Sequence, residues 1–175
     1  MTREDYYRWA EAQPRGRFEL VEGEVVAMAP ERVAHIRAKA LAWLALRQAI
    51  ASAGVPCEAL SDGVTVEVGD DTTYEPDAVV DCTSTLDGDA VAASAPVVVV
   101  EVTSPSNSRV DLTTKFNDYF RVPSIRHYLI VHLRRRTVIH HRRTDNGRIE
   151  SAILSAGPIA LAPPGITIRV EELFG

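Results

Sequence analysis

The run from Ala95 to Tyr119 constrains the fold of this chain more than any other stretch. It begins with four consecutive valines, Val97 to Val100, behind a proline. An unbroken β-branched run of this kind is typical of a strand that is buried on both faces. The run ends in an acid, Glu101, whose burial is costly unless another group pairs with it. The pattern therefore predicts a central strand that carries a carboxylate at its end.

The second half of the same run predicts a helix that returns over this strand. Ser108-x-x-Asp111 matches a capping box and so marks the start of a helix. The apolar residues that follow at helical spacing form one stripe, namely Leu112, Phe116, Tyr119 and Phe120. Lys115 lies at the border of the stripe, where its stem can pack while its amine reaches out. Strand and helix together predict an acid and a lysine at one site.

Helices and short strands alternate along the rest of the chain. The expected helices are one capped by Thr2 and ended by Pro14, and one from Glu31 to about Ala53. The expected strands are Phe18–Val21, Glu24–Met28, Pro56–Leu60, Val64–Val68, one from Ala78, Ile125–His132, Thr137–Arg142, Arg148–Leu154, Ile159–Leu161 and Ile166–Ile168. Pro56–Leu60 and Val64–Val68 are expected to form a hairpin across Ser61-Asp62-Gly63. This order predicts an α/β or α+β fold, with one mixed β-sheet flanked by helices.

Length and composition favour a single domain that spans residues 1–175. The hydrophobic content of 46% suits a substantial core, and no apolar run is long enough to span a bilayer. No hydrophobic region follows a basic start, so no signal peptide is expected. Cys57 and Cys82 make no disulfide framework and fit no metal or redox spacing. A reducing, cytoplasmic location without a membrane partner is the simplest interpretation.

Charge is distributed unevenly along the chain. The net charge of −5 argues against a strong nucleic-acid binder as a whole. However, residues 55–101 hold eleven acids and no Lys or Arg, whereas residues 121–150 hold eight Arg and two acids. This pattern suits a metal site beside a phosphate-binding surface. The alternative is an acidic loop region and a solvated Arg-rich hairpin, and charge alone favours this alternative. Arg134, Arg135 and Arg136 are the candidate phosphate contacts in the basic segment.

Asp77, Glu101 and Lys115 form the sharpest candidate site. Two carboxylates at strand ends, completed by a backbone carbonyl, can hold Mg²⁺ or Mn²⁺ through oxygen. Such an ion stabilises charge on a phosphate and lowers the pKa of a bound water, and a nearby lysine can orient that water. The alternative is three separate structural roles: a turn aspartate, a buried salt bridge and a surface lysine. Spacing alone gives the two interpretations about equal weight.

Five motifs in order resemble the Uma-type family of restriction-like endonucleases within the PD-(D/E)XK nuclease superfamily. They are FELVEGEVVAMAP, a following His35, YEPDAVV, VVVVEVTSPSNSRVDLTTKFNDYF and IRHYLIV, which together span Arg17 to Val131. The superfamily lysine two positions after Glu101 is absent, because Thr103 stands there. In the Uma-type pattern this lysine has moved to the following helix, where Lys115 stands.

The resemblance implies a restriction-endonuclease-like core with a catalytic metal site. Asp77, Glu101 and the carbonyl of Val102 would bind the metal, and Lys115 would be the catalytic amine. A further acid is implied at Glu19, with Glu24 as the alternative. His35 would either face the cleft near the metal and the nucleic acid or pair locally.

The function expected is a Mg²⁺- or Mn²⁺-dependent DNA endonuclease. The alternative is a catalytically inactive protein of the same fold that binds nucleic acid or a protein partner. DNA is the expected partner, and a homodimer is compatible with this expectation.

Overall fold

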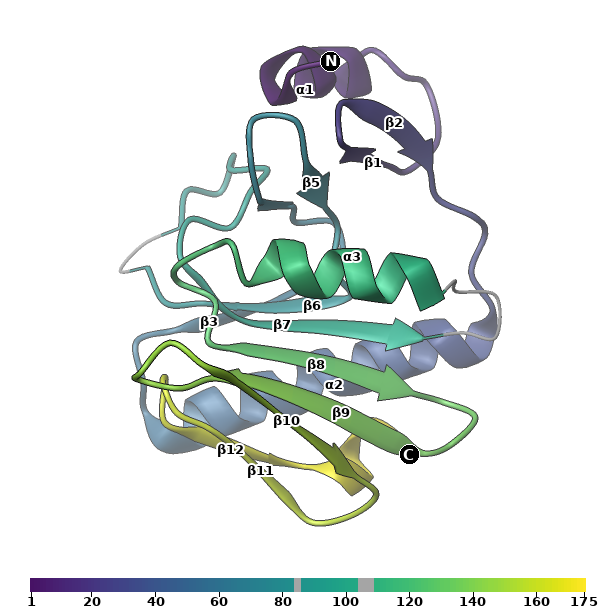
Figure 1. Cartoon of the computed structure of the whole chain (residues 1–175). Coiled ribbons are helices and arrows are strands. Elements are labelled where there is room, and N and C mark those ends of the chain that lie inside the picture. Colours follow the sequence, from purple (N-terminus) through teal and green to yellow (C-terminus); the bar gives the residue numbers. More distant parts are fainter. Residues whose placement is uncertain (84–85, 104–108) are drawn as a thin grey trace.

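The computed structural model describes residues 1–83, 86–103 and 109–175 (Figure 1). In chain order, the elements are α1 (Arg3–Glu11), β1 (Phe18–Val21), β2 (Glu24–Ala27), α2 (Val33–Ala53), β3 (Glu58–Ser61), β4 (Val66–Glu67), β5 (Thr73–Tyr74), β6 (Ala78–Asp81), β7 (Pro96–Thr103), α3 (Arg109–Tyr119), β8 (His127–His132), β9 (Thr137–Arg143), β10 (Ile149–Leu154), β11 (Pro158–Leu161), β12 (Ile166–Arg169) and the 3-10 helix η1 (Val170–Leu173). Most of the expected elements are present. The capping box at Ser108 lies outside the described residues.

The large sheet has six strands in the order β10-β9-β8-β7-β6-β3. The β7–β8 pair is parallel, and the other pairs are antiparallel, so the sheet is mixed as predicted. Strand β7 has a neighbour on each side, and all eight of its residues are buried. The valine run of the sequence is therefore the buried central strand.

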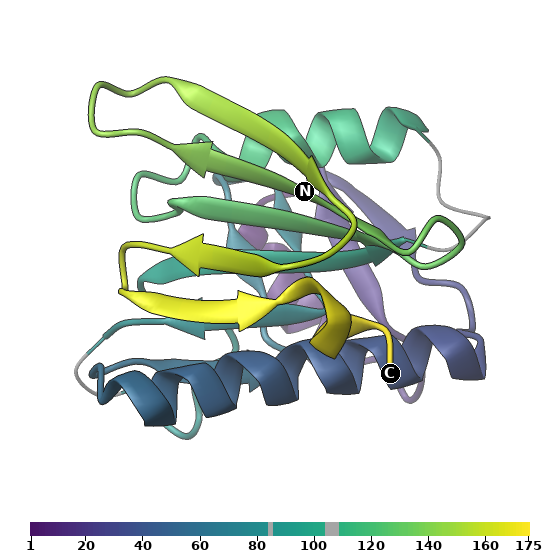
Figure 2. The ribbon, with the colours of Figure 1, turned by 90° about the horizontal axis from the view of Figure 1, so that it is seen from below.

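Helices cover both faces of this sheet (Figures 1 and 2). Three alternate residues of β7 pack with α2 and the β11–β12 hairpin on one face: Val98, Val100 and Val102. Val99 packs on the other face with Tyr119 of α3. Glu101 is two residues after Val99, so its side chain points to the α3 face. The pleat thereby delivers the acid of the central strand to the helix that follows it.

A smaller sheet with the order β2-β1-β5-β4 packs beside the large one. The predicted hairpin between residues 56–60 and 64–68 is wrong, because β3 pairs with β6 in the large sheet and β4 pairs with β5 in the small one. The Ser61-Asp62-Gly63 segment thus carries the chain from one sheet to the other. A turn signal in the sequence marks where the chain bends but does not identify the partner of each strand.

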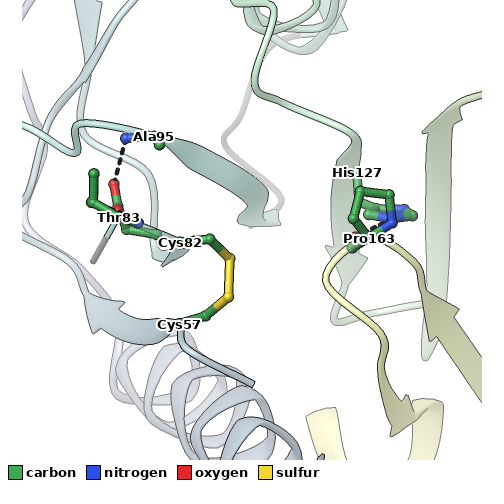
Figure 3. Close-up of a disulfide and its surroundings, with 7 residues drawn as sticks. Cys57, Cys82, Thr83, Ala95, His127 and Pro163 are labelled. Carbon is green, nitrogen blue, oxygen red and sulfur yellow. Dashed lines mark hydrogen bonds between the residues drawn. A yellow bond between two sulfur atoms is a disulfide. The ribbon is translucent and has the colours of Figure 1, made fainter. Parts of the chain in front are cut away.

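A disulfide joins Cys57 and Cys82, contrary to the expectation from the sequence (Figure 3). The two cysteines flank the antiparallel pair Glu58–Asp81 of β3 and β6, and their Cα atoms lie 4.1 Å apart. Strand pairing therefore brings together two residues that are 25 positions apart in the sequence. The bond fastens the edge strand β3 to the strand that begins next to Asp77.

None of the helices in the described part of the chain combines the length and the apolar content that crossing a membrane requires.

Candidate active site

Lys115 and Glu101 meet at the C-terminal end of the central strand. The Lys115 Nζ atom lies 3.1 Å from Oε1 of Glu101 and 2.9 Å from Oε1 of Glu19 on β1. Tyr119, one turn after Lys115 on α3, donates a hydrogen bond of 2.7 Å to the same Glu101 oxygen. Lys115 is only 5% exposed, so it is buried and not at the border of the packed stripe. The structure thus brings together the strand acid and the helix lysine that the sequence singled out.

Glu19 and Glu24 are separated by the β1–β2 hairpin. Glu19 is buried, contacts Lys115 and also accepts a hydrogen bond of 3.0 Å from the backbone N–H of Glu75. Glu24 is exposed on β2. Of the two acids that the FELVEGE motif offered, Glu19 is the one that contacts Lys115, and Lys115 also contacts Glu101.

Asp77 stands just before β6, and its carboxylate reaches β7. Its Oδ2 atom accepts a hydrogen bond of 2.6 Å from the N–H of Val102, the residue after Glu101. Its Oδ1 atom lies 3.1 Å from the Nζ atom of Lys39 on α2. Lys39 of α2 therefore forms an ion pair with Asp77, and Lys115 of α3 forms one with Glu101.

Burial raises the pKa values of both strand acids. Burial is the largest cause for Asp77, and the Val102 N–H and the charge of Lys39 oppose it. Burial raises the pKa of Glu101 to about 7; the charge of Lys115 opposes this shift, and the charges of Asp77 and Glu19 add to it. A cation in this place is favourable, because the ionised carboxylates have little water around them.

Lys39 is the centre of an ion cluster that the sequence analysis missed. Its Nζ atom lies 2.6 Å from Oε1 of Glu31 and 2.7 Å from Oδ2 of Asp62, in addition to its contact with Asp77. Arg17 contributes a second positive charge, 2.9 Å from the same Asp62 oxygen. His35 and Lys39 are four residues apart and so lie on one face of α2, and Glu31 stands two residues before the helix begins. That spacing is a sequence signal for the α2 part of the cluster only, because Asp62 and Asp77 come from other segments.

His35 lies between the metal-ligand candidates and the Lys39 cluster. Its Nε2–H donates a hydrogen bond of 2.6 Å to the carbonyl of Val102, and Nε2 is 3.7 Å from Oδ2 of Asp77. Its Nδ1 atom is 3.6 Å from Oε2 of Glu31. Of the two predicted placements, the structure has His35 beside the candidate metal ligands, in contact with the β7 backbone.

The donor set of the site suits a divalent metal. Asp77, Glu101 and the Val102 carbonyl supply oxygen atoms, which Mg²⁺ and Mn²⁺ prefer. In the described part of the chain, the acidic or histidine side chains that bring ligand atoms within 4.8 Å of one another are Glu31, His35 and Asp77. The raised pKa values of the two strand acids favour a cation near them. The residues present therefore fit the metal that the sequence motifs imply.

A pocket of about 380 Å³ adjoins Asp77 on the α2 side. Charged side chains and an apolar wall line it together, the wall consisting of Ile36, Ala40 and Trp43. The candidate site is therefore open beside the Lys39 cluster.

The arginine turn lies at the same end of the sheet as the carboxylates. Thr103 and His132 are partners at the ends of the parallel strands β7 and β8, and the turn follows His132 directly (Figure 1). Arg134, Arg135 and Arg136 are exposed, and the guanidinium of Arg136 stacks 5.2 Å from the Phe174 ring centre. All three arginines thus lie exposed at the end of the sheet that carries the candidate site, and Arg136 packs on Phe174.

Comparisons with known proteins place the chain among nuclease-like proteins. The Uma2 family model, described as "Putative restriction endonuclease", matches residues 3–171. A solved structure from Anabaena variabilis ATCC 29413, described as "a putative nuclease belonging to DUF820", is similar with a TM-score of 0.75. The match covers 99% of this chain and 97% of that chain at 15% identity, so it establishes the fold. No curated protein matches the chain.

Proposed function

Because the chain belongs to the Uma2 family, we propose that it is a metal-dependent endonuclease that hydrolyses phosphodiester bonds in DNA. The observation that carries this proposal is the contact of buried Lys115 with Glu101, beside an Asp77 that is hydrogen-bonded to the next β7 residue. Such a set combines oxygen ligands for a metal with a fixed positive charge.

The residues divide the chemical tasks between them. Asp77, Glu101 and the Val102 carbonyl would hold Mg²⁺ or Mn²⁺. A bound divalent ion supplies positive charge to a phosphate and lowers the pKa of a water molecule. Lys115 positions the attacking water and adds a charge that is fixed before the reaction begins, which is the condition for effective electrostatic stabilisation.

Two further groups keep this lysine and its acid in place. Tyr119 donates to the Glu101 oxygen that Lys115 also contacts, and Glu19 binds the ammonium from the other side. Side chains held in this way keep their geometry without reorganising during the reaction.

One observation favours a second candidate function. Lys39 and Lys115 already neutralise Asp77 and Glu101, as expected of a centre that is balanced without a metal. Under this alternative, the chain is a catalytically inactive protein of the nuclease fold that binds nucleic acid or a protein partner.

Cleavage of supercoiled plasmid DNA in the presence of Mn²⁺ tests the proposal. Wild type should nick the plasmid, and Glu101→Gln should abolish nicking because it removes a charged metal ligand. Glu24→Gln is the matched control, because this exposed acid of the β1–β2 hairpin lies outside the site. Equal nicking by wild type and Glu101→Gln would reject the assignment. DNA binding by wild type without cleavage would support the inactive alternative.

A further inference from the structure

Lys39 occupies a position that resembles a cation-binding site built from three different segments. Its ammonium lies 2.6 Å, 2.7 Å and 3.1 Å from one oxygen each of Glu31, Asp62 and Asp77. The side chain is 5% exposed, so water screens these contacts little. Three carboxylates around one buried ammonium leave a surplus of negative charge, which Arg17 partly offsets through Asp62 and Glu31.

The charge of Lys39 is stable in this place. Its amine contacts one oxygen each of Glu31, Asp62 and Asp77, and three neighbouring carboxylates favour the protonated ammonium. The amine therefore remains protonated at neutral pH and acts as a fixed cation.

We propose that the Lys39 ammonium is a permanent cation of the candidate active site. It takes the place of a second divalent metal and limits the site to one bound metal ion. This inference rests on the proposed function, because it presumes that Asp77 and Glu101 bind one metal. Lys39 is here a positioning residue, since it acts through the carboxylates that it contacts.

The surroundings of Lys39 support this role. Glu31, His35 and Asp77 have ligand atoms within 4.8 Å of one another, close enough for a single ion. An ammonium and a divalent ion repel each other, so Lys39 disfavours a metal on the carboxylates of Glu31 and Asp77 that it contacts. Without the ammonium, three carboxylates and a histidine would face one small space, a donor set that binds divalent metals.

Lys39 also fixes Asp77 before any metal arrives. The ammonium holds Oδ1, and the Val102 N–H holds Oδ2 at 2.6 Å. Each carboxylate oxygen thus has a partner, and the two contacts together fix the orientation of the group. Lys115 differs in this respect, because its carboxylate contacts are Glu101 and Glu19.

The test is the number of Mn²⁺ ions bound per chain, measured from the loss of the free Mn²⁺ signal in electron paramagnetic resonance. Wild type should bind one ion. Lys39→Met removes the charge but keeps a long unbranched side chain, and it should bind two. Lys39→Arg keeps the charge and should bind one. Adding Glu31→Gln and Asp62→Asn to Lys39→Met should return the number to one. Circular dichroism confirms folding of each variant.

The outcomes separate this inference from the proposed function. One ion in wild type and one in folded Lys39→Met would overturn the inference alone, and so would two ions in wild type. No ion in wild type would overturn both. If Lys39→Met does not fold, the double variant Glu31→Gln/Asp62→Asn, which keeps Lys39, tests the inference instead. This double variant should still bind one ion. Loss of that ion would place the single metal on the Lys39 acids and overturn the inference.

Discussion

At the scale of single residues, Lys115 has both a structural and a proposed chemical role. It is buried between Glu19 and Glu101, so its removal leaves two acids without their shared cation. Removing one partner of a buried ion pair costs roughly 3–5 kcal/mol. The raised pKa of Glu101, about 7, reduces this cost, because the acid can take up a proton near neutral pH. A border position, as the sequence indicated, would have made the same substitution nearly neutral.

Lys115→Ala should therefore lower stability by up to about 3 kcal/mol and lower the Mn²⁺-dependent cleavage rate by about 10²–10³-fold, the scale for losing one fixed stabilising group. Lys115→Arg should recover little activity, because a planar guanidinium does not fit the place of a compact ammonium. Urea unfolding and single-turnover cleavage measure the two effects. Asn117→Ala, an exposed change on the same helix, is the control. Full activity in Lys115→Ala would remove this lysine from the mechanism.

Part of the site was predictable from the sequence and part was not. The motifs indicated Asp77, Glu101, Lys115 and Glu19, and the structure brings their side chains to one end of β7 and β6. The Lys39 cluster depends on how α2 is rotated against the sheet and on the path of the chain between β3 and β4. Neither is encoded by local periodicity, so Asp62 was read as a turn residue only.

At the scale of elements, the same limit explains the errors. The hydrophobic pattern identified nearly every strand, because period and β-branched content are local properties. The partner of β3 is a distant strand, β6, and the Cys57–Cys82 disulfide follows from that pairing. Both features depend on the pairing of strands that are distant in the sequence, which local hydrophobic patterns do not specify.

The β8–β9 turn gives a prediction at this scale. Arg134, Arg135 and Arg136 lie at the sheet end that carries the candidate site, and we expect them to contact phosphates. Replacing all three by Ala should weaken DNA binding equally for different sequences. It should also reduce the slope of log affinity against log salt by about 2–3, because each phosphate contact contributes about one. Fluorescence anisotropy with two unrelated duplexes at several salt concentrations measures this. An unchanged slope would mark the turn as a solvated surface. Arg136→Ala alone, whose guanidinium stacks on Phe174, should change the slope least.

At the scale of the whole molecule, buried His127 and half-buried His140 connect the large sheet with the C-terminal segment. His127 Nε2 lies 2.9 Å from the Pro163 carbonyl, which only accepts, so this nitrogen carries the proton (Figure 3). In a neutral ring His127 Nδ1 is then an acceptor, and His140 Nε2–H donates to it at 2.9 Å. This chain of hydrogen bonds joins β8, β9 and the loop before β12. It is complete only while His127 is neutral, because a protonated Nδ1 could not accept from His140.

The stability of the protein should therefore depend on pH through this pair. Burial lowers the pKa of His127 to about 4, assisted by the neighbouring His140, and burial with the charge of Arg142 lowers that of His140 to about 4. The unfolded chain, with ordinary pKa values near 6.5, binds more protons between these limits. The contribution of the pair is therefore complete above about pH 6.5 and is lost as the pH falls toward 4.

Glu101 acts in the opposite direction over part of the same range. Its pKa of about 7 means that the folded chain binds its proton more readily, so its share of the stability decreases as the pH rises toward 7. A pH profile of wild type alone mixes the two effects.

We therefore compare wild type with His127→Asn/His140→Asn, which keeps Glu101. The difference in unfolding free energy between them should grow by roughly 3–6 kcal/mol from pH 4 to pH 7, because each histidine contributes up to about 3 kcal/mol. Urea denaturation at each pH gives this difference. A difference that stays constant across the range would show that the two histidines do not titrate as a buried neutral pair.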